Sequence, residues 1–398
     1  MRAELSFAEV VDAVAAEVEE RLPGYLRRQP LRCAGTRFAG SCRRIARVWG
    51  LPLEAVPDDS VVNTVDRHLR DRLAEAGACE LGAADDHELA ALHARCAAAR
   101  EAVRSRVAAL PHRLEQRSVA RIPQLRYAAI GRGEPPVVII NAFGQTRAPW
   151  LPLIERLSRR CRVMLWDLRD TGACGELVTF AEHCEDLDGI LAQEGARRCH
   201  LLGWCTGAKL AARYSRTRPG AVASQVLLGG SFKYPGRAPE LDTAYERNLE
   251  AMLQAVAREP ALAERLRLVL ALATAGDIDL DRMDGDALAQ HALTRVPDGL
   301  RRDVRHPFRD AASLVVYARQ HLEFWSIDET TGAPHVPVPT LGVTGQHDQI
   351  VFPAGFRAAV ERFPVSRFHV VAATTHYCIH ERPDSVAGLI EEWIGAAQ

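Results

Sequence analysis

The sequence predicts an α/β protein with a mostly parallel, doubly wound sheet, a helical lid insertion and a helical N-terminal region. Short apolar runs alternate with helical patterns over residues 119–231, and this alternation resumes over residues 336–398. A Gly-x-Cys-x-Gly sequence also lies where an apolar run gives way to an Ala-rich helix. Alternating strands and helices are typical of a parallel sheet with helices on both faces.

Composition argues against several classes of protein, namely nucleic-acid-binding, membrane-spanning and secreted proteins. The chain has 398 residues and a net charge of −1, which gives no support for nucleic-acid binding. No apolar stretch is long enough to span a membrane, and the acidic N-terminal stretch does not resemble a secretory signal. The ten cysteines form no zinc-like cluster. We therefore expect reduced thiols, no metal site and a cytoplasmic protein without membrane or nucleic-acid partners.

Residues 1–118 are expected to be helical, with no convincing strand. Apolar residues recur at helical spacing from Phe7 to Val18, and a further helix is predicted over residues 87–110. This region also contains seven arginines that form either a solvated helix face or a docking surface for an acidic partner: Arg27, Arg28, Arg32, Arg37, Arg43, Arg44 and Arg47.

Predicted strands and helices alternate along both sheet segments. Strands are predicted at residues 119–131, 135–144, 161–169, 199–204, 222–230, 338–345 and 368–374. Helices are predicted at residues 148–159, 179–195, 206–220, 354–363 and 385–394.

A helical block over residues 232–335 interrupts this alternation. It is predicted to form a lid over the carboxyl ends of the strands, where open parallel sheets bind their ligands. Several large side chains in this block can belong either to a pocket or to the core: Phe308, Tyr317, His321, Phe324 and Trp325.

The strongest chemical signal is Gly203-Trp204-Cys205-Thr206-Gly207, between a predicted strand and a predicted helix. A nucleophile elbow needs this context, with small residues at Gly203 and Gly207 because the turn is tight. Cys205 would lie at a helix N-terminus, where the dipole favours a thiolate. The alternative is a buried cysteine in a Gly-rich turn.

Two further residues would complete a triad. Asp348 follows the strand at residues 338–345 and can orient a histidine, although it could instead cap the next helix. His376 follows the last strand, and it is preferred over His380, which lies closer to the final helix. His347 is interpreted as a loop histidine. The chain order Cys, Asp, His is the one that this kind of sheet requires.

An oxyanion hole needs two N–H donors. We expect one from Thr206, the residue after the nucleophile, and the other from Phe143, in the loop after the strand at residues 135–144. Asn141, Gln145 and Trp204 are further candidates for the pocket. Asn141 and Gln145 could simply be structural, and buried packing explains Trp204 better than a substrate contact does.

These segments resemble the α/β-hydrolase superfamily over about 120–230 and 336–395. The loop Asn141-Ala142-Phe143-Gly144 is similar to the family's His-Gly-x-Gly loop, and His376, Glu381 and Pro383 match its terminal His-x4-Glu-x-Pro element. The chain departs from the family pattern at Asn141-Ala142 and at Asp170, where glycine is usual in a strand-end turn.

The family nucleophile is usually serine, so Cys205 limits the resemblance to those groups of the family that use cysteine. Polyhydroxyalkanoate synthases and dienelactone hydrolases use cysteine. So do the acyl- or aminoacyl-shuttling transferases of nonribosomal peptide pathways, of the syringomycin and coronamic acid type. The last resemblance implies transfer between the phosphopantetheine thiols of acyl or peptidyl carrier proteins, with no cofactor bound by the enzyme itself.

Our leading hypothesis from sequence is an acyl or aminoacyl transferase that works through an acyl-Cys205 intermediate. An acyl-cysteine is itself a thioester, so exchange with other thiols is nearly isoenergetic, and His376 would move the proton. The alternatives are a cysteine-dependent hydrolase or thioesterase, a polyester synthase (although Ala208 stands where its Gly-x-Cys-x-Gly-Gly elbow has the final glycine) and a non-enzymatic receptor. The acyl group and the oligomeric state, including a homodimer, stay open.

Overall fold

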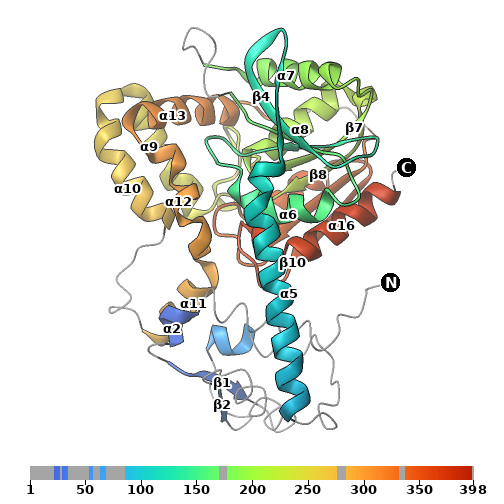
Figure 1. The fold of residues 1–398 in the computed structure, drawn as a ribbon. Helices are drawn as coiled ribbons and strands as arrows, with labels where there is room; N and C mark the ends of the chain where they lie inside the picture. The colour runs from blue at the N-terminus through green and yellow to red at the C-terminus, as the bar shows by residue number, and fades with distance from the viewer. Residues whose placement is uncertain are drawn as a thin grey trace. The chain divides into compact units, whose positions relative to one another are not determined.

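The computed structural model describes most of the chain, namely residues 22–26, 29–34, 53–56, 63–68, 86–169, 177–275, 284–330 and 337–396. The chain divides into two compact units. One contains residues 1–108 and 277–298, and the other contains residues 109–276 and 299–398 (Figure 1).

The larger unit is built on an eight-stranded sheet in the order β10-β9-β8-β7-β5-β6-β4-β3. Strands β5 to β10 pair in parallel, whereas β3 and β4 form an antiparallel hairpin at one edge. The mostly parallel, doubly wound sheet is therefore confirmed. The strands are β3 (Glu115–Val119), β4 (Ile122–Ile130), β5 (Val137–Ile140), β6 (Val163–Trp166), β7 (Cys199–Trp204), β8 (Val222–Leu228), β9 (Thr340–Gly345) and β10 (Ser366–Val371).

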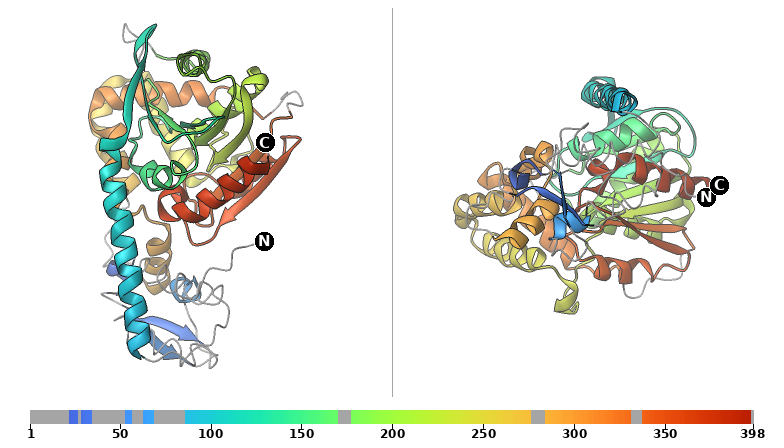
Figure 2. Two further views of the ribbon diagram at one scale, coloured as in Figure 1. Left: turned by 45° about the vertical axis from the view of Figure 1, so that its right-hand side comes forward. Right: turned by 90° about the horizontal axis from the view of Figure 1, so that it is seen from below.

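Helices cover both faces of this sheet (Figures 1 and 2). On one face α6 (Leu151–Leu157) packs against α16 (Pro383–Ala396), and on the other α7 (Phe180–Gln193) packs against α8 (Thr206–Thr217). Helix α14 (Pro353–Val360) packs against β9 and β10. Because both faces are covered, β5 and β7 are buried at every position, as expected for central parallel strands.

The strand order determines where a site can form. Strand β5 lies between β6 and β7. The chain therefore runs from β5 to β6 on one side, and then crosses back over β5 to reach β7 on the other side. Such a reversal opens a crevice at the carboxyl ends of the strands. The loop after β5 and the turn after β7 meet there.

Among the described residues, the insertion between β8 and β9 contributes four α-helices to the larger unit, and α9, α10 and α13 pack on one another. They are α9 (Ala244–Arg258), α10 (Ala263–Ala275), α12 (Arg301–Val304) and α13 (Ala311–Trp325). A fifth helix, α11 (Gly285–Thr294), belongs instead to the smaller unit, where it packs against α2 (Pro23–Leu26). The helical insertion is thus divided between the two units.

The N-terminal region differs from the helical expectation. Strands β1 (Leu31–Ala34) and β2 (Leu53–Val56) form a parallel pair, and β3 begins before residue 118. The expectation of no strand there is wrong because four-residue strands are too short to show an alternating pattern. Helix α5 (Asp86–Arg113) agrees with the predicted helix. Of the arginine-rich stretch, Arg32 is exposed on β1, and the others lie outside the described residues.

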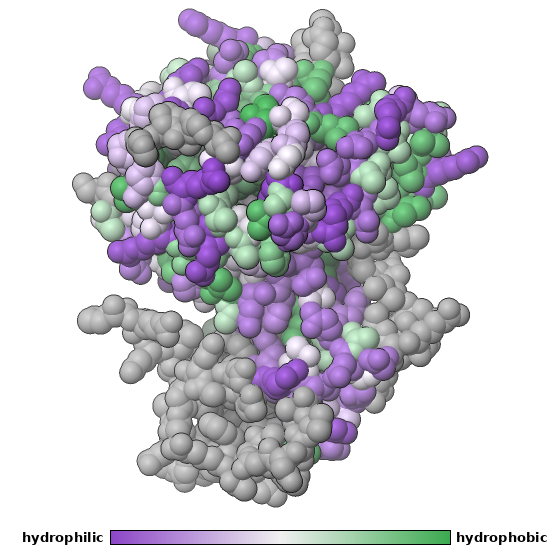
Figure 3. Space-filling model, turned by 180° about the vertical axis from the view of Figure 1, so that it is seen from behind, coloured by the Kyte–Doolittle hydropathy of each residue, from purple (hydrophilic) through white to green (hydrophobic). Residues whose placement is uncertain are grey.

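Six large apolar side chains are exposed among the described residues. No helix in this part of the chain has the length and apolar character needed to cross a membrane. Figure 3 shows one face, on which hydrophilic residues predominate and hydrophobic residues are scattered between them. The large apolar side chains with substantial exposure lie on several separate elements: Val103, Leu268, Val269, Phe352, Val365 and Val370.

Replacing Gly345 with alanine should destabilise the larger unit. A Cβ at Gly345 would lie 2.0 Å from the backbone oxygen of Thr375, so β9 or the following loop would have to move. We expect a loss of about 3 kcal/mol in the free energy of unfolding, measured by denaturant titration. The control is Gly388→Ala in α16, where a Cβ meets nothing within 4 Å and a gain of about 0.5 kcal/mol is expected. Equal effects of the two substitutions would contradict this account.

Candidate active site

Cys205 lies at the sharp turn between β7 and α8. Its backbone has φ 53° and ψ −115°, a left-handed conformation that residues other than glycine rarely adopt. The turn is tight on both sides. A Cβ on Gly203 would lie 2.5 Å from Gly207 O, and a Cβ on Gly207 would lie 2.3 Å from Ile140 O. Cys205 is partly exposed.

The end of β8 holds the backbone of this turn. Cys205 N donates to Leu228 O at 2.9 Å, and Ser231 N donates to Cys205 O at 3.1 Å. These two hydrogen bonds fix the strained residue from the neighbouring strand, which is how such a conformation persists in a folded protein.

Asp348 and His376 lie together beside Cys205. His376 Nδ1 is 2.8 Å from Asp348 Oδ2, and His376 also forms a side-chain hydrogen bond with Cys205. The other carboxylate oxygen, Oδ1, accepts from the backbone N–H groups of Ile350 and Val351, each at 2.9 Å. The carboxylate is therefore held by hydrogen bonds at both oxygens, and Asp348 and His376 are each 4% exposed.

The loop that carries His376 is fixed by its neighbours. Trp204 Nε1 donates to His376 O at 3.2 Å, and the two rings lie 5.4 Å apart. Thr375 N donates to Glu381 Oε2 at 2.7 Å, which gives the predicted terminal motif a structural role. Gly229 has φ 47°, and a Cβ there would lie 3.0 Å from the imidazole. Sequence pattern alone does not indicate Gly229, although Gly229-Gly230 directly follows an apolar strand.

The charges around His376 favour the protonated, positively charged form of its side chain. Burial disfavours the imidazolium, but the charges of Asp348 and Cys205 and the hydrogen bonds to both outweigh burial and raise the pKa of His376 to about 10. His376 therefore holds its proton at neutral pH and loses it as the pH rises through about 10.

The loop after β5 differs from the expectation that the Phe143 N–H is an oxyanion donor. Phe143 N donates to Thr206 Oγ1 at 3.0 Å, so this N–H is not free to bind an oxyanion as predicted. Thr206 is the first residue of α8, and its own backbone N–H therefore has no acceptor within the helix. Of the two predicted donors, only the N–H of Thr206 is available in this conformation.

Asn141 corrects a second expectation. Its Oδ1 accepts from Ala142 N and from Trp150 Nε1, both at 2.9 Å, and its Nδ2 donates to the backbone oxygens of Gln145 and Thr146, both at 3.0 Å. Asn141 thus shapes the loop and does not line the pocket as predicted.

A pocket of about 600 Å³, part of it open to solvent, lies above Cys205. Its wall comes from the strand ends and from the helical insertion, consistent with the insertion acting as a lid. Gln145 lines it, and so does Trp204, which is only 2% exposed. Of the insertion's large side chains, Phe308, Tyr317, His321 and Trp325 line it as well. Phe324 belongs to the core, 4.2 Å from the ring of Phe143 between ring centroids.

Four polar lining residues were not indicated by the sequence: Ser231, Tyr245, Glu246 and Tyr377. The competing histidines do not line this pocket: His347 lies in the turn after β9, and His380 lies in the short helix α15 (Cys378–Glu381). Among the described residues, no group of three His, Cys, Asp or Glu side chains is arranged to hold a metal ion.

Fold and site together define an α/β hydrolase. Residues 135–383 match the α/β hydrolase fold family, so the chain belongs to it. Pimeloyl-(acyl-carrier protein) methyl ester esterase of Aeromonas hydrophila subsp. hydrophila is 25% identical over 280 residues, covering 67% of this chain and 97% of the relative. A 2-hydroxy-6-oxononadienedioate/2-hydroxy-6-oxononatrienedioate hydrolase of Pseudomonas putida is 26% identical, covering 68% and 91%.

Solved structures share this fold. A thermophilic esterase from Thermogutta terrifontis has a TM-score of 0.52 at 23% identity and covers 71% of this chain and 98% of its own. A bromoperoxidase from Bacillus anthracis has a TM-score of 0.54 at 18% identity and covers 71% and 99%. At these identities the likeness concerns the fold alone.

Replacing Asp348 with asparagine should lower the pKa of His376 from about 10, because the main charge that opposes burial is removed. We expect the imidazole to titrate several pH units lower, measured by NMR on protein with isotopically labelled histidine. Asp384→Asn, which removes an exposed carboxylate paired with Arg156, should leave the His376 pKa unchanged. A His376 pKa that is the same in both variants would show that Asp348 does not set it.

Proposed function

We propose that this chain is an enzyme that cleaves acyl thioesters through a covalent acyl-Cys205 intermediate, with hydrolysis as the overall reaction. The observation that carries the proposal is the position of Cys205, on a strained elbow and beside the charged pair of His376 and Asp348. Membership of the α/β hydrolase family and relatives named as esterases and hydrolases support hydrolysis. One of these relatives is named for a substrate on an acyl carrier protein.

The sulfur nucleophile favours a thioester as the donor. Acyl transfer from a thioester to Cys205 makes another thioester and costs little free energy, whereas transfer from an oxygen ester would be uphill. The proposed substrate is therefore a thioester, whereas the name of the Aeromonas hydrophila relative refers to a methyl ester. A thioester on the phosphopantetheine arm of a carrier protein fits both observations, and such a substrate would place the reaction in the cytoplasm.

The proposed steps balance in protons. The Cys205 thiolate attacks the carbonyl carbon, and the oxyanion forms beside the backbone N–H of Thr206. The C–S bond of the donor then breaks, and the departing thiolate takes the proton from His376. Next, water gives a proton to His376 and attacks the acyl-Cys205 carbonyl. The acid leaves, and the thiolate and imidazolium are restored.

A second candidate is transfer of the acyl group to another thiol, such as that of an acyl or peptidyl carrier protein. The observation in its favour is Cys205 itself, because an acyl-cysteine exchanges readily with thiols. The pocket wall formed by the helical insertion would also slow attack by water. The named activities of the relatives favour water as the acceptor.

Acyl thioesters should label Cys205. We expect one acyl group per chain when the protein meets acetyl- or hexanoyl-N-acetylcysteamine, seen as an intact-mass increase and mapped to Cys205 by peptide analysis. Cys205→Ala should show no increase. Cys161→Ala removes a half-buried cysteine outside the pocket lining and should label like the wild type. Labelling that persists in Cys205→Ala, or is absent from the wild type with every thioester, would reject the proposal.

Water and thiol can be compared directly as acceptors. Acyl-Cys205 enzyme, freed of donor, is mixed with excess pantetheine, and free acid and new thioester are quantified by mass spectrometry. The proposal predicts that free acid is the main product and that pantetheine changes its release little. Accumulation of acyl-pantetheine with little acid would instead identify the transferase.

A further inference from the structure

The oxyanion of the proposed reaction has one backbone donor in this conformation, the N–H of Thr206. The N–H of Phe143 is occupied by Thr206 Oγ1, a hydroxyl on a residue that is 2% exposed. Releasing this N–H would leave the buried hydroxyl oxygen without its donor, which costs free energy. Because an oxyanion hole needs two donors, we looked for the second one among the side chains of the pocket wall.

Tyr317 of α13 has a hydroxyl without a hydrogen bond to any part of the chain that the structure describes. Its side chain lines the pocket that contains Cys205 and is 8% exposed. Most buried hydroxyls in proteins have a hydrogen-bond partner, because burial without one is costly. The hydroxyl of Tyr317 is therefore available to a ligand that enters the pocket.

The ring of Tyr317 lies against the loop after β5. A Cβ on Gly144 would be 3.2 Å from Tyr317 Cδ2, so the ring approaches closely because this position has no side chain. Gly144 directly follows Phe143 and has φ 62°. Tyr317 thus lies beside the loop from which the sequence predicted the second oxyanion donor.

The hydroxyl of Tyr317 is close enough to Cys205 to be influenced by its charge. Burial raises the pKa of this hydroxyl well above its usual value, and the charges of Tyr245, Cys205 and Tyr377 raise it further. These three residues line the same pocket. The phenol therefore keeps its proton at neutral pH and can donate a hydrogen bond without adding a negative charge.

Neighbouring rings hold Tyr317 in place. The ring of His321 is 4.0 Å away between centroids, and the ring of Phe308 is 5.5 Å away at an interplanar angle of 83°. Lys209 Nζ on α8 donates to Phe324 O, which attaches α13 to the helix that begins at the elbow. A donor that is positioned before the reaction needs little reorganisation when charge develops.

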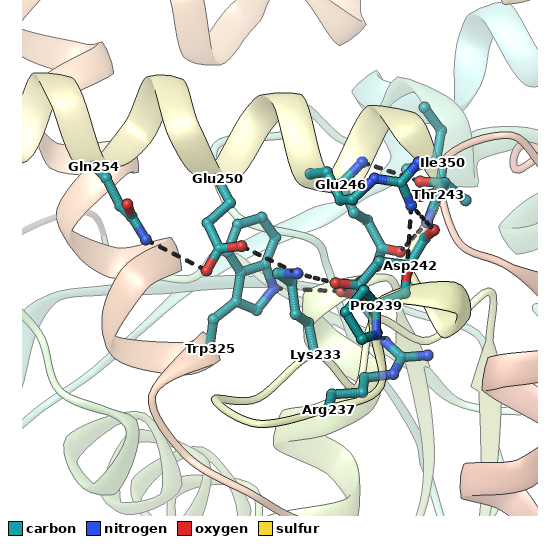
Figure 4. A network of polar contacts seen from close by, with 12 residues as sticks. Lys233, Arg237, Pro239, Asp242, Thr243, Glu246, Glu250, Gln254, Trp325 and Ile350 are labelled. Atoms are coloured by element: carbon teal, nitrogen blue, oxygen red, sulfur yellow. Dashed lines mark hydrogen bonds and ion pairs between the residues drawn. The ribbon is translucent and has the colours of Figure 1, made fainter.

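Trp325, the last residue of α13, is held by two contacts to the segment after β8. Its Nε1 donates to Ser231 Oγ at 3.3 Å, and the ammonium group of Lys233 lies 5.8 Å from the centre of its ring. Figure 4 shows Lys233 next to both this ring and Glu250 of α9, whose Oε2 is 3.1 Å from the ammonium group. Ser231 N also donates to Cys205 O, so α13 is connected to the elbow itself.

We propose that Tyr317 is a catalytic residue, whose hydroxyl donates a hydrogen bond to the oxyanion together with the N–H of Thr206. When the Cys205 thiolate attacks the thioester carbonyl, the π electrons of the C=O bond move to the oxygen. The phenol stabilises this charge and keeps its own proton. The same contact forms again when water or a thiol attacks acyl-Cys205. This inference rests on the proposed acyl-Cys205 intermediate.

Two other polar side chains of the pocket are the competing assignments. The ring of Tyr377 is 5.6 Å from Trp204 and 5.7 Å from His376, which places it on the histidine side of the site. The buried atom of Gln145 that has no partner is its acceptor oxygen Oε1, whereas an oxyanion needs a donor. Both observations favour Tyr317.

The central test is Tyr317→Phe, which keeps the ring and removes only the hydroxyl. The rate of Cys205 acylation by hexanoyl-N-acetylcysteamine is followed by intact mass over a range of substrate concentrations. We expect the maximal rate to fall about 100-fold, the effect of losing one oxyanion donor, with little change in the concentration that gives half the maximal rate. The midpoint of urea unfolding should not fall, because the hydroxyl has no protein partner to lose.

Tyr214→Phe is the matched control. Tyr214 is also a buried tyrosine, but its hydroxyl donates to Asp188 at 2.6 Å and does not line the pocket. This variant should acylate at the wild-type rate and unfold at a lower urea concentration, which is the reverse of the result expected for Tyr317→Phe.

Infrared spectroscopy detects the proposed hydrogen bond in the acyl-enzyme. The acyl-Cys205 state is formed with excess thioester that carries an isotopically labelled carbonyl. A hydrogen bond to the carbonyl oxygen weakens the C=O bond, so its stretching frequency should be lower in the wild type than in Tyr317→Phe. A role of Tyr317 in packing alone would not change this frequency.

The outcomes keep the two proposals apart. If Cys205 is acylated and Tyr317→Phe matches the wild type in rate and carbonyl frequency, the assignment to Tyr317 is wrong and the acyl-enzyme proposal stands. The assignment is equally wrong if Tyr317→Phe unfolds more easily than the wild type, or if only Tyr377→Phe or Gln145→Met slows acylation. If the wild type is never acylated, the acyl-enzyme proposal itself fails.

Discussion

The site depends on the left-handed backbone of Cys205. A residue with φ 53° between a strand and a helix needs neighbours without side chains, and Gly203 and Gly207 provide that space. Hydrogen bonds to Leu228 and from Ser231 hold the turn against β8. The strain is thus balanced by the central sheet. This arrangement directs the thiol into the crevice and leaves the N–H of Thr206 at the helix start.

The second constraint is charge. Asp348 is held by backbone N–H groups from its own loop, so its carboxylate cannot move away when His376 becomes charged. The imidazolium and the sulfur then form a polar centre at the bottom of a pocket whose remaining wall is largely apolar and aromatic. Glu246 adds a carboxylate to that wall, beside uncharged polar residues such as Gln145 and Ser231.

The sheet, and the proximity of Cys205, Asp348 and His376, could be predicted from sequence because their signals are local. Apolar runs mark the strands, and Gly203 and Gly207 flank Cys205 in a fixed spacing. The features that escaped prediction depend on contacts between distant segments. The N–H of Phe143 is occupied by a hydroxyl 63 positions away, and Glu246 faces the pocket only because α9 folds over the strand ends. Short strands β1 and β2 also lack any periodic signal.

The most direct measurement is a crystal structure of the protein after reaction with a thioester whose acyl-enzyme turns over slowly. The account predicts continuous density from Cys205 Sγ to the acyl carbon, with the carbonyl oxygen next to Thr206 N and His376 beside the sulfur. Unmodified Cys205 with an intact thioester in the pocket, or an acyl group on another residue, would contradict it.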